Sequence, residues 1–384
     1  MKTVGIICEY NPFHLGHQRQ FDLIRKEFGE DTMIICIMSG NYVQRGVPAM
    51  WDKYTRANAA VACGADLVFE LPITKVLSSA EGFARGGVEI LVKFGCTDIL
   101  CFGAECGDTE QIMNTARKLN DPTYKDRLQN FLSQGMSYAA AKQASLDDST
   151  SLLSDPNNIL GVEYCRAILE INSTLTPFAI KRNGGYHDTA ADASEPSATA
   201  VRALYPNDNW KQFVPEASAS LLSSARYYAL SAGERAVLAR LRALNEDEWE
   251  QCAHGSEGLW SKAMKASRTQ GSYEAIVDAV KSKRYPRTRI QRLLLCAYLG
   301  IRQHHLQQAI SYTRLLAFSP RSRSLLRKIK DTAEISVVNP GEIPNDKDFY
   351  AIETRAADLF TLFCTDNICL CRTEQDARVF IPHN

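Results

Sequence analysis

TVGIICEYNPFHLGH, residues 3–17, is the stretch of this 384-residue chain that decides its fold. The apolar run Thr3–Cys8 predicts a strand buried on both faces. Asn11 and Pro12 end that strand, because proline cannot donate to a sheet and the residue before it avoids the helical region. A helix is predicted over His14–Phe28. A strand, a tight turn and a helix in this order are typical of the start of a parallel α/β sheet.

The same alternation continues along the chain. Further strands are predicted at Met33–Met38, Leu67–Leu71, Asp98–Phe102 and Pro177–Lys181, and helices at Asp52–Cys63, Ser79–Phe94 and Asn158–Ile171. This pattern predicts a Rossmann-like parallel sheet over residues 1–205, with the carboxyl ends of the strands along one edge. Ligands of open α/β sheets bind at that edge.

The rest of the chain has a different character. From Ala217 to Lys330 the recognisable patterns are helical, so residues 206–330 are expected to form a mostly helical second domain. Residues 331–384 are acidic, with a strand-like Ile335–Val338 and a helical Tyr350–Phe363, and their role is not predicted.

Composition excludes several protein classes. With 45% apolar and 23% charged residues the chain is an ordinary globular protein rather than a disordered one. Neither a membrane-spanning run nor a signal-peptide core is present, and the 12 cysteines are scattered. A cytosolic, soluble protein is therefore expected, and Cys364, Cys369 and Cys371 with His383 make only an imperfect metal pattern, so no metal site is predicted.

The zero net charge conceals an asymmetry. Residues 281–330 carry thirteen Lys and Arg and neither Asp nor Glu, whereas the segments on either side are acidic. Such a segment is typical of a protein that binds a polyanion, although a solvated basic helix surface would give the same count. Contacts to the polyanion are predicted at Lys283, Arg284, Arg287, Arg289 and Arg292.

His14 and His17 are the strongest candidates for chemistry. They are three residues apart, so both project from one side of the first helical turn, and Gly16 leaves the backbone open between them. Free N–H groups and the positive end of the helix dipole make that turn an anion site. Two surface histidines would look the same, but a zinc site prefers another spacing and no P-loop is present. The motif therefore indicates nucleotide binding, with both imidazoles stabilising charge during nucleotidyl transfer.

These residues resemble a known family. NPFHLGH at 11–17 is similar to the HxGH signature of the nucleotidyltransferase superfamily. Longer segments resemble the bacterial tRNA(Met) cytidine acetate ligases up to about Gly300; they are MSGNYVQRGVPA at 38–49, GADLVFELP at 64–72, FGAE at 102–105, PNNILG at 156–161 and RYPRTRIQR at 284–292.

The resemblance implies an activity. ATP and acetate would form acetyl-adenylate, and the acetyl group would pass to N4 of the wobble cytidine of elongator tRNA(Met). His14 and His17 would be catalytic, and Mg²⁺ would accompany the triphosphate. ATP contacts are expected at Ile7, Cys8, Glu9, Tyr10, Asn11, Pro12, Phe13, His14, Leu15, Gly16, His17, Gln18, Arg19, Gln20, Gly103, Asn157, Asn158, Arg182, Ser197, Thr199 and Arg202.

Some of these assignments stay open at the level of sequence. Only one of Asn157 and Asn158 is expected to contact ATP, and the segment of Ser197, Thr199 and Arg202 is either a phosphate clamp or an ordinary capped helix. The loop at 39–46 is a candidate for acetate recognition. Two other functions fit part of the sequence: a small-molecule adenylyl- or cytidylyltransferase, which leaves the basic segment unexplained, and an RNA-binding protein with a vestigial nucleotide fold.

Overall fold

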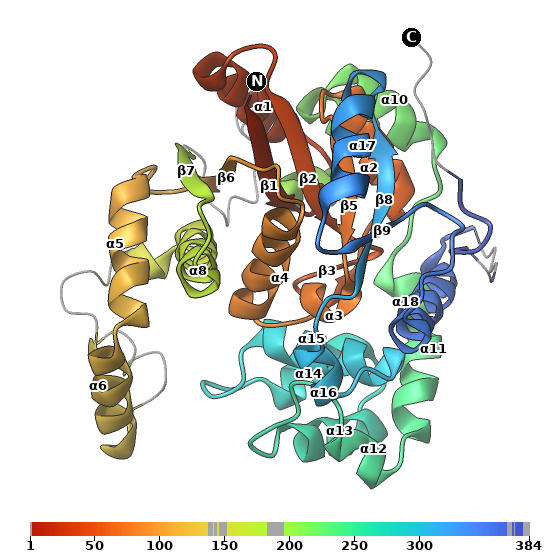
Figure 1. Cartoon of the computed structure of the whole chain (residues 1–384). Coiled ribbons are helices and arrows are strands. Elements are labelled where there is room, and N and C mark those ends of the chain that lie inside the picture. The colour runs from red at the N-terminus through yellow and green to blue at the C-terminus, as the bar shows by residue number, and fades with distance from the viewer. Residues whose placement is uncertain are drawn as a thin grey trace.

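A seven-stranded sheet forms the centre of the computed structural model, which describes residues 2–136, 141, 144–145, 152–182, 196–366, 371 and 373–378. The strand order is β7-β6-β1-β2-β5-β8-β9 (Figure 1). The strands are β1 (Thr3–Cys8), β2 (Met33–Ser39), β5 (Leu67–Leu71), β6 (Ile99–Ala104), β7 (Thr176–Lys181), β8 (Tyr312–Phe318) and β9 (Ser336–Val338). The first five are mutually parallel, as the sequence predicted, so the Rossmann-like fold is confirmed.

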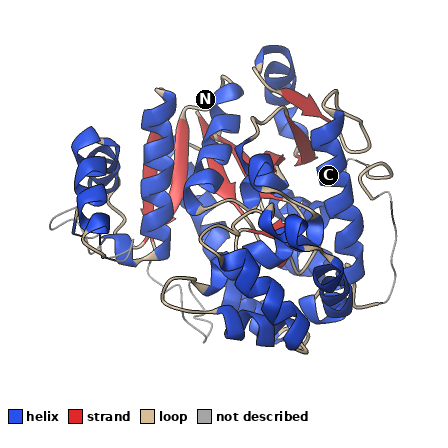
Figure 2. Ribbon diagram, turned by 90° about the horizontal axis from the view of Figure 1, so that it is seen from below, coloured by secondary structure: helices blue, strands red, loops and turns tan. Residues whose placement is uncertain are grey.

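Helices cover both faces of this sheet (Figure 2). Alternate residues of β1 and β2 point to opposite faces, which is why both strands read as continuous apolar runs. One face packs on α1 (Leu15–Phe28) and α2 (Lys53–Ala62), and the other packs on α4 (Ala80–Lys93) and α8 (Pro156–Ile171). Against α8 lies α5 (Thr109–Asn120), and α6 (Pro122–Ser133) follows it at the margin of the molecule (Figure 1).

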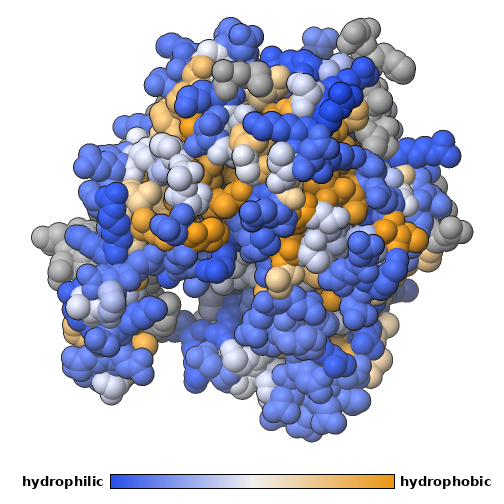
Figure 3. Space-filling view, viewed as in Figure 1, coloured by the Kyte–Doolittle hydropathy of each residue, from blue (hydrophilic) through white to orange (hydrophobic). Residues whose placement is uncertain are grey.

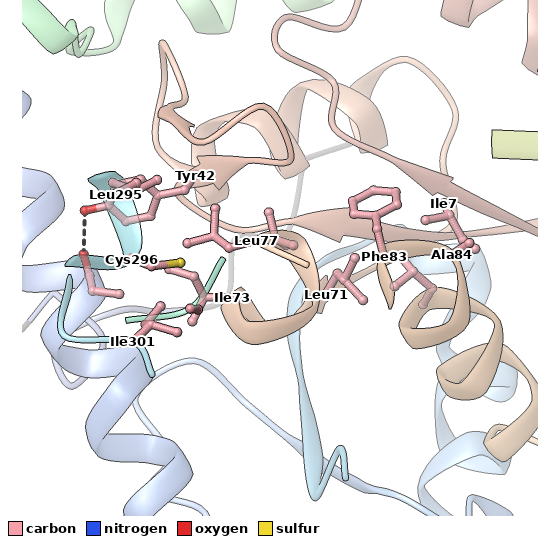
Figure 4. Close-up of a cluster of buried hydrophobic side chains, with 14 of the residues drawn as sticks. Ile7, Tyr42, Leu71, Ile73, Leu77, Phe83, Ala84, Leu295, Cys296 and Ile301 are labelled. Carbon is pink, nitrogen blue, oxygen red and sulfur yellow. Dashed lines mark hydrogen bonds between the residues drawn. The ribbon is translucent and has the colours of Figure 1, made fainter. Parts of the chain in front are cut away.

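The second helical region lies below the carboxyl ends of the strands in Figure 1. Its helices are α11 (Leu230–Ala243), α12 (Glu246–Glu250), α13 (Leu259–Thr269), α14 (Tyr273–Val280), α15 (Arg287–Leu299), α16 (Gln303–Gln307) and α18 (Lys347–Phe360). The remaining helices are α3 (Ile73–Val76), α9 (Ala198–Leu204), α10 (Glu216–Ser224) and α17 (Arg323–Thr332), and of these α10 and α17 lie beside the sheet at the top of Figure 1. Buried apolar side chains run without a break from the sheet into the second helical region, from Ile7 and Phe83 through Leu77 to Leu295 and Ile301 (Figure 4).

One strand lies where helix was expected. β8 falls inside the range that the sequence analysis took as helical, and it pairs antiparallel with β5. Its charged residue Arg314 interrupts the apolar pattern that would have indicated a strand. The fold nevertheless buries Arg314, because Glu374 lies 3.1 Å from its Nε and supplies the compensating charge. The segment 312–338 therefore belongs to the sheet rather than to the helical region.

The outer surface of the helical region is mostly hydrophilic (Figure 3). Within the described residues, no helix combines the length and the apolar character needed to cross a membrane.

Candidate active site

A cavity of about 470 Å³ opens at the carboxyl ends of β1 and β6. Its walls come from the turn after β1, the start of α1, the end of β7 and the start of α9. The chain turns sharply after β1 through Tyr10, which has a φ of +43°, and a cis Asn11–Pro12 bond. This turn points the first residues of α1 into the cavity, which is the position that the sequence predicted for an anion site.

The two histidines of the motif are stacked, with ring centroids 3.7 Å apart. His14 Nδ1 accepts the N–H of Gly16 at 3.1 Å, and His17 Nδ1 accepts the N–H of His14 at 3.2 Å. Because both Nδ1 atoms accept hydrogen bonds, the neutral rings carry their proton on Nε2. Both imidazoles therefore present an Nε2–H donor, and both rings line the cavity.

The electrostatic surroundings keep these rings neutral. Burial lowers the pKa of His14 to about 3, and the nearby Arg182 and Arg202 contribute to the lowering. Burial, His14 and Arg182 lower the pKa of His17 in the same direction. Neutral stacked rings avoid the repulsion between two imidazolium ions, and they still donate hydrogen bonds to an anion.

Ser197, Thr199 and Arg202 lie together at the start of α9. Ser197 Oγ caps the helix by accepting the N–H of Ala200 at 3.1 Å. Arg202 donates to the carbonyl of Asn11 at 2.6 Å and to Thr199 Oγ1 at 3.2 Å. Arg202 thus joins α9 to the turn after β1, and all three side chains line the cavity. The segment is both a capped helix and a wall of the cavity.

The structure distinguishes the two asparagines. Asn157 lines the cavity, donates to Glu105 at 2.6 Å and accepts from Arg182 at 3.3 Å. Asn158 is buried, and its Oδ1 accepts the N–H of Cys106 outside the cavity wall. A Cβ on Gly103 would lie 2.9 Å from Cδ of Arg182, so a side chain there would push that guanidinium aside.

Glu9 lies where the cavity meets the hairpin of β3 (Tyr42–Val43) and β4 (Val47–Pro48). Its Oε1 accepts the N–H of Gln44 at 2.7 Å, and its Oε2 has no hydrogen-bond partner among the described residues. Burial raises the pKa of Glu9, whereas the Gln44 N–H, Arg56 and Arg202 oppose that rise. Arg56 is fully buried and donates to the carbonyls of Glu9, Ser39 and Gly40, which ties the ends of β1 and β2 together.

Most of the predicted ATP-contacting residues line the cavity. Within residues 7–20 the exceptions are Pro12, Phe13, Leu15 and Gln18. Phe13 packs in the core against Tyr10 and Phe21, and Gln18 points outward to Asp22. These positions belong to the motif because they shape the turn and the helix, not because they face the cavity.

Sequence reasoning missed several wall residues. Met50 and Tyr228 line the cavity from distant segments, joined by a hydrogen bond from the Tyr228 N–H to the Met50 carbonyl. Behind the wall, the Glu105 carboxylate accepts hydrogen bonds from Asn157 and Asn158 and so fixes their positions. The FGAE segment at 102–105 contains this residue and could have indicated it. Arg56 had no signal, because a single arginine in an amphipathic helix looks solvated.

The basic segment does not form one surface. Arg287 pairs with Glu274 and with Asp278, and Arg289 lies 2.9 Å from Glu257. Arg292 is largely buried and donates to the carbonyl of Gln44, so it supports the β3–β4 hairpin.

The other half of the segment lies at the opposite end of the sheet. Arg321 bonds Asp66, just before β5, at the amino ends of the strands (Figure 1). The thirteen basic residues between 281 and 330 therefore do not form a single surface, because the chain folds the two halves of this segment apart.

Among the described residues, no group of three or more His, Cys, Asp or Glu side chains could hold a metal ion. Cys364 is buried and Cys371 is exposed, whereas Cys369 and His383 lie outside the described residues.

Three comparisons place this chain among known proteins. The family model described as HIGH Nucleotidyl Transferase matches residues 1–376. A protein of Acetivibrio thermocellus named tRNA(Met) cytidine acetate ligase is 35% identical over 88% of both chains. A Clostridium perfringens protein of the same name is 33% identical over 94% of this chain and 95% of its own.

Two solved structures share the whole fold. The apo crystal structure of Thermotoga maritima TmcAL superposes with a TM-score of 0.90 at 28% identity, covering 100% of both chains. The same protein bound with alpha-thio ATP gives a TM-score of 0.88 at 29% identity, covering 99% of both. The chain therefore belongs to the HIGH nucleotidyl transferase family, and within it to the tRNA(Met) cytidine acetate ligases.

Proposed function

We propose that this protein activates acetate with ATP and transfers the acetyl group to N4 of the wobble cytidine of elongator tRNA(Met). The observation that carries the proposal is the pair of neutral Nε2–H donors of His14 and His17 at the start of α1, with Arg182 and Arg202 beside them on one cavity. The relatives' shared name supplies the acetate, the cytidine and the tRNA.

In the first half-reaction, a carboxylate oxygen of acetate attacks the α-phosphorus of ATP. The bond from that phosphorus to the bridging oxygen of the β-phosphate breaks, and pyrophosphate leaves. Negative charge grows on the leaving oxygens, where His14 and His17 donate hydrogen bonds and Arg202 supplies a cation. Ser197 and Thr199 hold the distal phosphates, and Arg182 with Asn157 holds the nucleoside side of the substrate.

Mg²⁺ fits this cavity as a partner of the triphosphate. Because no cluster of acidic ligands occurs among the described residues, phosphate oxygens and water would supply most of its coordination, as is usual for this ion. Its contribution would be to neutralise charge on the phosphates.

In the second half-reaction, N4 of cytidine attacks the carbonyl carbon of acetyl-adenylate. The bond from that carbon to the AMP oxygen breaks, and N4 must lose a proton. Glu9 is the carboxylate on the cavity wall among the described residues, its Oε2 makes no hydrogen bond to any of them, and burial raises its pKa, which strengthens it as a proton acceptor. We assign to Glu9 the acceptance of this proton, and to Gln44 and Arg45 of the adjoining hairpin the binding of acetate.

The tRNA is proposed to approach over the β3–β4 hairpin and the start of α15. Lys283, Arg284, Arg287 and Arg289 lie on this approach, where phosphate contacts would position the RNA without selecting its sequence. Arg292 was predicted to make such a contact, but it is largely buried and supports the hairpin through the Gln44 carbonyl instead. Residues 1–205 would then supply catalysis, and the helical part of residues 206–330, which ends before β8, would supply RNA contact. Residues 331–384 would contribute the support that Glu374 gives to β8. A tRNA substrate also implies a cytosolic protein.

Acetate-dependent exchange of labelled pyrophosphate into ATP tests the first half-reaction without tRNA. The proposal expects exchange with acetate, and its loss in His14→Ala and His17→Ala. Exchange that needs no carboxylic acid, or that needs another small nucleophile, would favour a small-molecule nucleotidyltransferase instead.

A further inference from the structure

A second cavity of about 470 Å³ lies in the helical region, away from the active site. Its wall is formed by α11, α12, α18 and the end of α15. The floor is apolar and includes Leu244, Ala297 and Leu359. Tyr298 lines this cavity, and its ring packs on that of Phe363, with the ring centroids 5.7 Å apart.

Three arginines from separate segments line this cavity. They are Arg240 of α11, Arg302 just before α16 and Arg355 of α18. Glu248 is the single carboxylate on the wall within the described residues, and it pairs with Arg240 at 3.2 Å. Arg355 donates to the carbonyl of Leu299 at 2.8 Å, and Arg302 is exposed at the rim of the cavity.

Like charges gathered in this way repel one another. Burial lowers the pKa of Arg355, and the nearby Arg240 and Arg302 lower it further. Burial also lowers the pKa of His305, which follows Arg302 in the chain, to about 4, with contributions from His304, Arg355 and Arg302. Among the described residues, three guanidinium groups and one carboxylate therefore line the cavity.

The arginines that the sequence predicted to bind RNA are balanced differently. Arg287 and Arg289 each pair with a carboxylate of a neighbouring segment. The excess of positive charge counted along the chain is thus partly neutralised at the start of α15. Around the second cavity, one carboxylate faces three guanidinium groups.

We propose that this second cavity binds a phosphate group, with the attached sugar or base against the apolar floor. Guanidinium forks match phosphate oxygens in geometry and keep their charge at all relevant pH values. The volume is that of a small-ligand site and exceeds what one phosphate needs, which leaves room for part of a nucleotide. The phosphate has two possible sources: the backbone of the bound tRNA, which rests on the proposed function, or a free phosphate compound, which does not.

The test uses the full-length protein and two charge-matched double variants. Arg240→Gln/Arg302→Gln removes two of the three cations and leaves Arg355 of α18, which is hydrogen-bonded to Leu299 at the end of α15. Arg323→Gln/Arg327→Gln is the control, because both side chains are exposed on α17 at the other end of the sheet. Binding of tRNA is measured by fluorescence anisotropy over a range of KCl concentrations, and binding of inorganic pyrophosphate by calorimetry with the active site filled by a non-hydrolysable ATP analogue.

If the phosphate belongs to the tRNA backbone, Arg240→Gln/Arg302→Gln should bind tRNA about tenfold more weakly than the wild type. The slope of log affinity against log salt concentration should then be lower by about 1 to 2, and Arg323→Gln/Arg327→Gln should change little. If the ligand is a free phosphate compound, tRNA binding should be unchanged, whereas the wild type should bind pyrophosphate and Arg240→Gln/Arg302→Gln should not. Unchanged binding of both probes, or equal losses in both variants, would overturn the proposal. If the wild-type protein binds no tRNA, the proposed function fails, and the pyrophosphate measurement still decides this inference.

Discussion

Glu9→Gln separates the two half-reactions more sharply than other changes in the active site. Glutamine keeps an Oε1 that accepts the Gln44 N–H, now 2.7 Å away, so the β3–β4 hairpin keeps its attachment to β1. The substitution removes only the negative charge and the proton acceptor. Both the shape of the cavity and the His14–His17 pair, which makes no hydrogen bond with the Glu9 side chain, are expected to persist.

The expected size of the effect follows from the role. A positioned general base contributes about 10² to 10⁴ in rate, so acetyl transfer to tRNA should fall by that factor. Acetate-dependent ATP–pyrophosphate exchange should change by less than about threefold, because no proton leaves acetate in that step. Glu110→Gln, an exposed position on α5, serves as the control and should affect neither step.

Single-turnover transfer from preformed acetyl-adenylate, followed from pH 5 to pH 8, supplies the assay. The carboxylate form of Glu9 is needed, and its pKa is raised, so the wild-type rate should climb with pH until it passes that pKa and then level. The Glu9→Gln variant should lack the climbing limb. Equal slowing of both half-reactions, or unchanged transfer, would refute the assignment of Glu9 as the proton acceptor.

Three further predictions concern stability. Lys53→Met should lower the free energy of unfolding by about 3–5 kcal/mol in denaturant titrations, because the buried Glu70 loses the ion-pair partner that lies 2.6 Å away and Glu374 keeps only Arg314. Exposed Lys347→Met should be neutral, and equal stability of both variants would contradict the buried ion network. Gly46→Ala should lower the free energy of unfolding by about 1–3 kcal/mol more than Gly29→Ala in the same titration. Both glycines have a positive φ, but only at Gly46 would an added Cβ meet backbone, since the N of Arg292 would lie 2.5 Å from it. Similar losses in the two variants would mean that the hairpin is not packed tightly on α15. The free energy of unfolding should fall as pH drops from about 6.5 toward 4. Burial lowers the pKa of His14 to about 3 and that of His254 to about 4, so the unfolded chain binds more protons than the folded one in that window. His254→Gln should make the melting temperature depend less on pH, and a pH dependence identical to that of the wild type would count against a buried neutral His254.

Local patterns predicted the parallel sheet well, and most of the residues that they proposed for an anion site line one cavity. The strand and helix at the N-terminus agree with the structure because a buried parallel strand needs a continuous apolar run, and because Asn11-Pro12 can only be a turn. The clustering of His14, Arg182 and Arg202 on one cavity followed from the rule that loops at strand carboxyl ends meet at one edge.

Features that depend on distant pairing were not predictable. β8 contains Arg314, whose burial is tolerated only because Glu374, sixty residues later, lies against it. Likewise, the charge count along residues 281–330 could not reveal that Arg287 faces Glu274 or that Arg321 faces Asp66. The sequence gives the number and order of the charged residues, but which of them form ion pairs depends on the fold.

The central claim is tested most directly by incubating the purified protein with ATP, Mg²⁺, labelled acetate and elongator tRNA(Met), and then analysing the nucleosides of that tRNA by mass. The account predicts AMP and pyrophosphate as products, with label in a cytidine heavier by one acetyl group at the wobble position. ATP turnover that leaves this cytidine unmodified would contradict it.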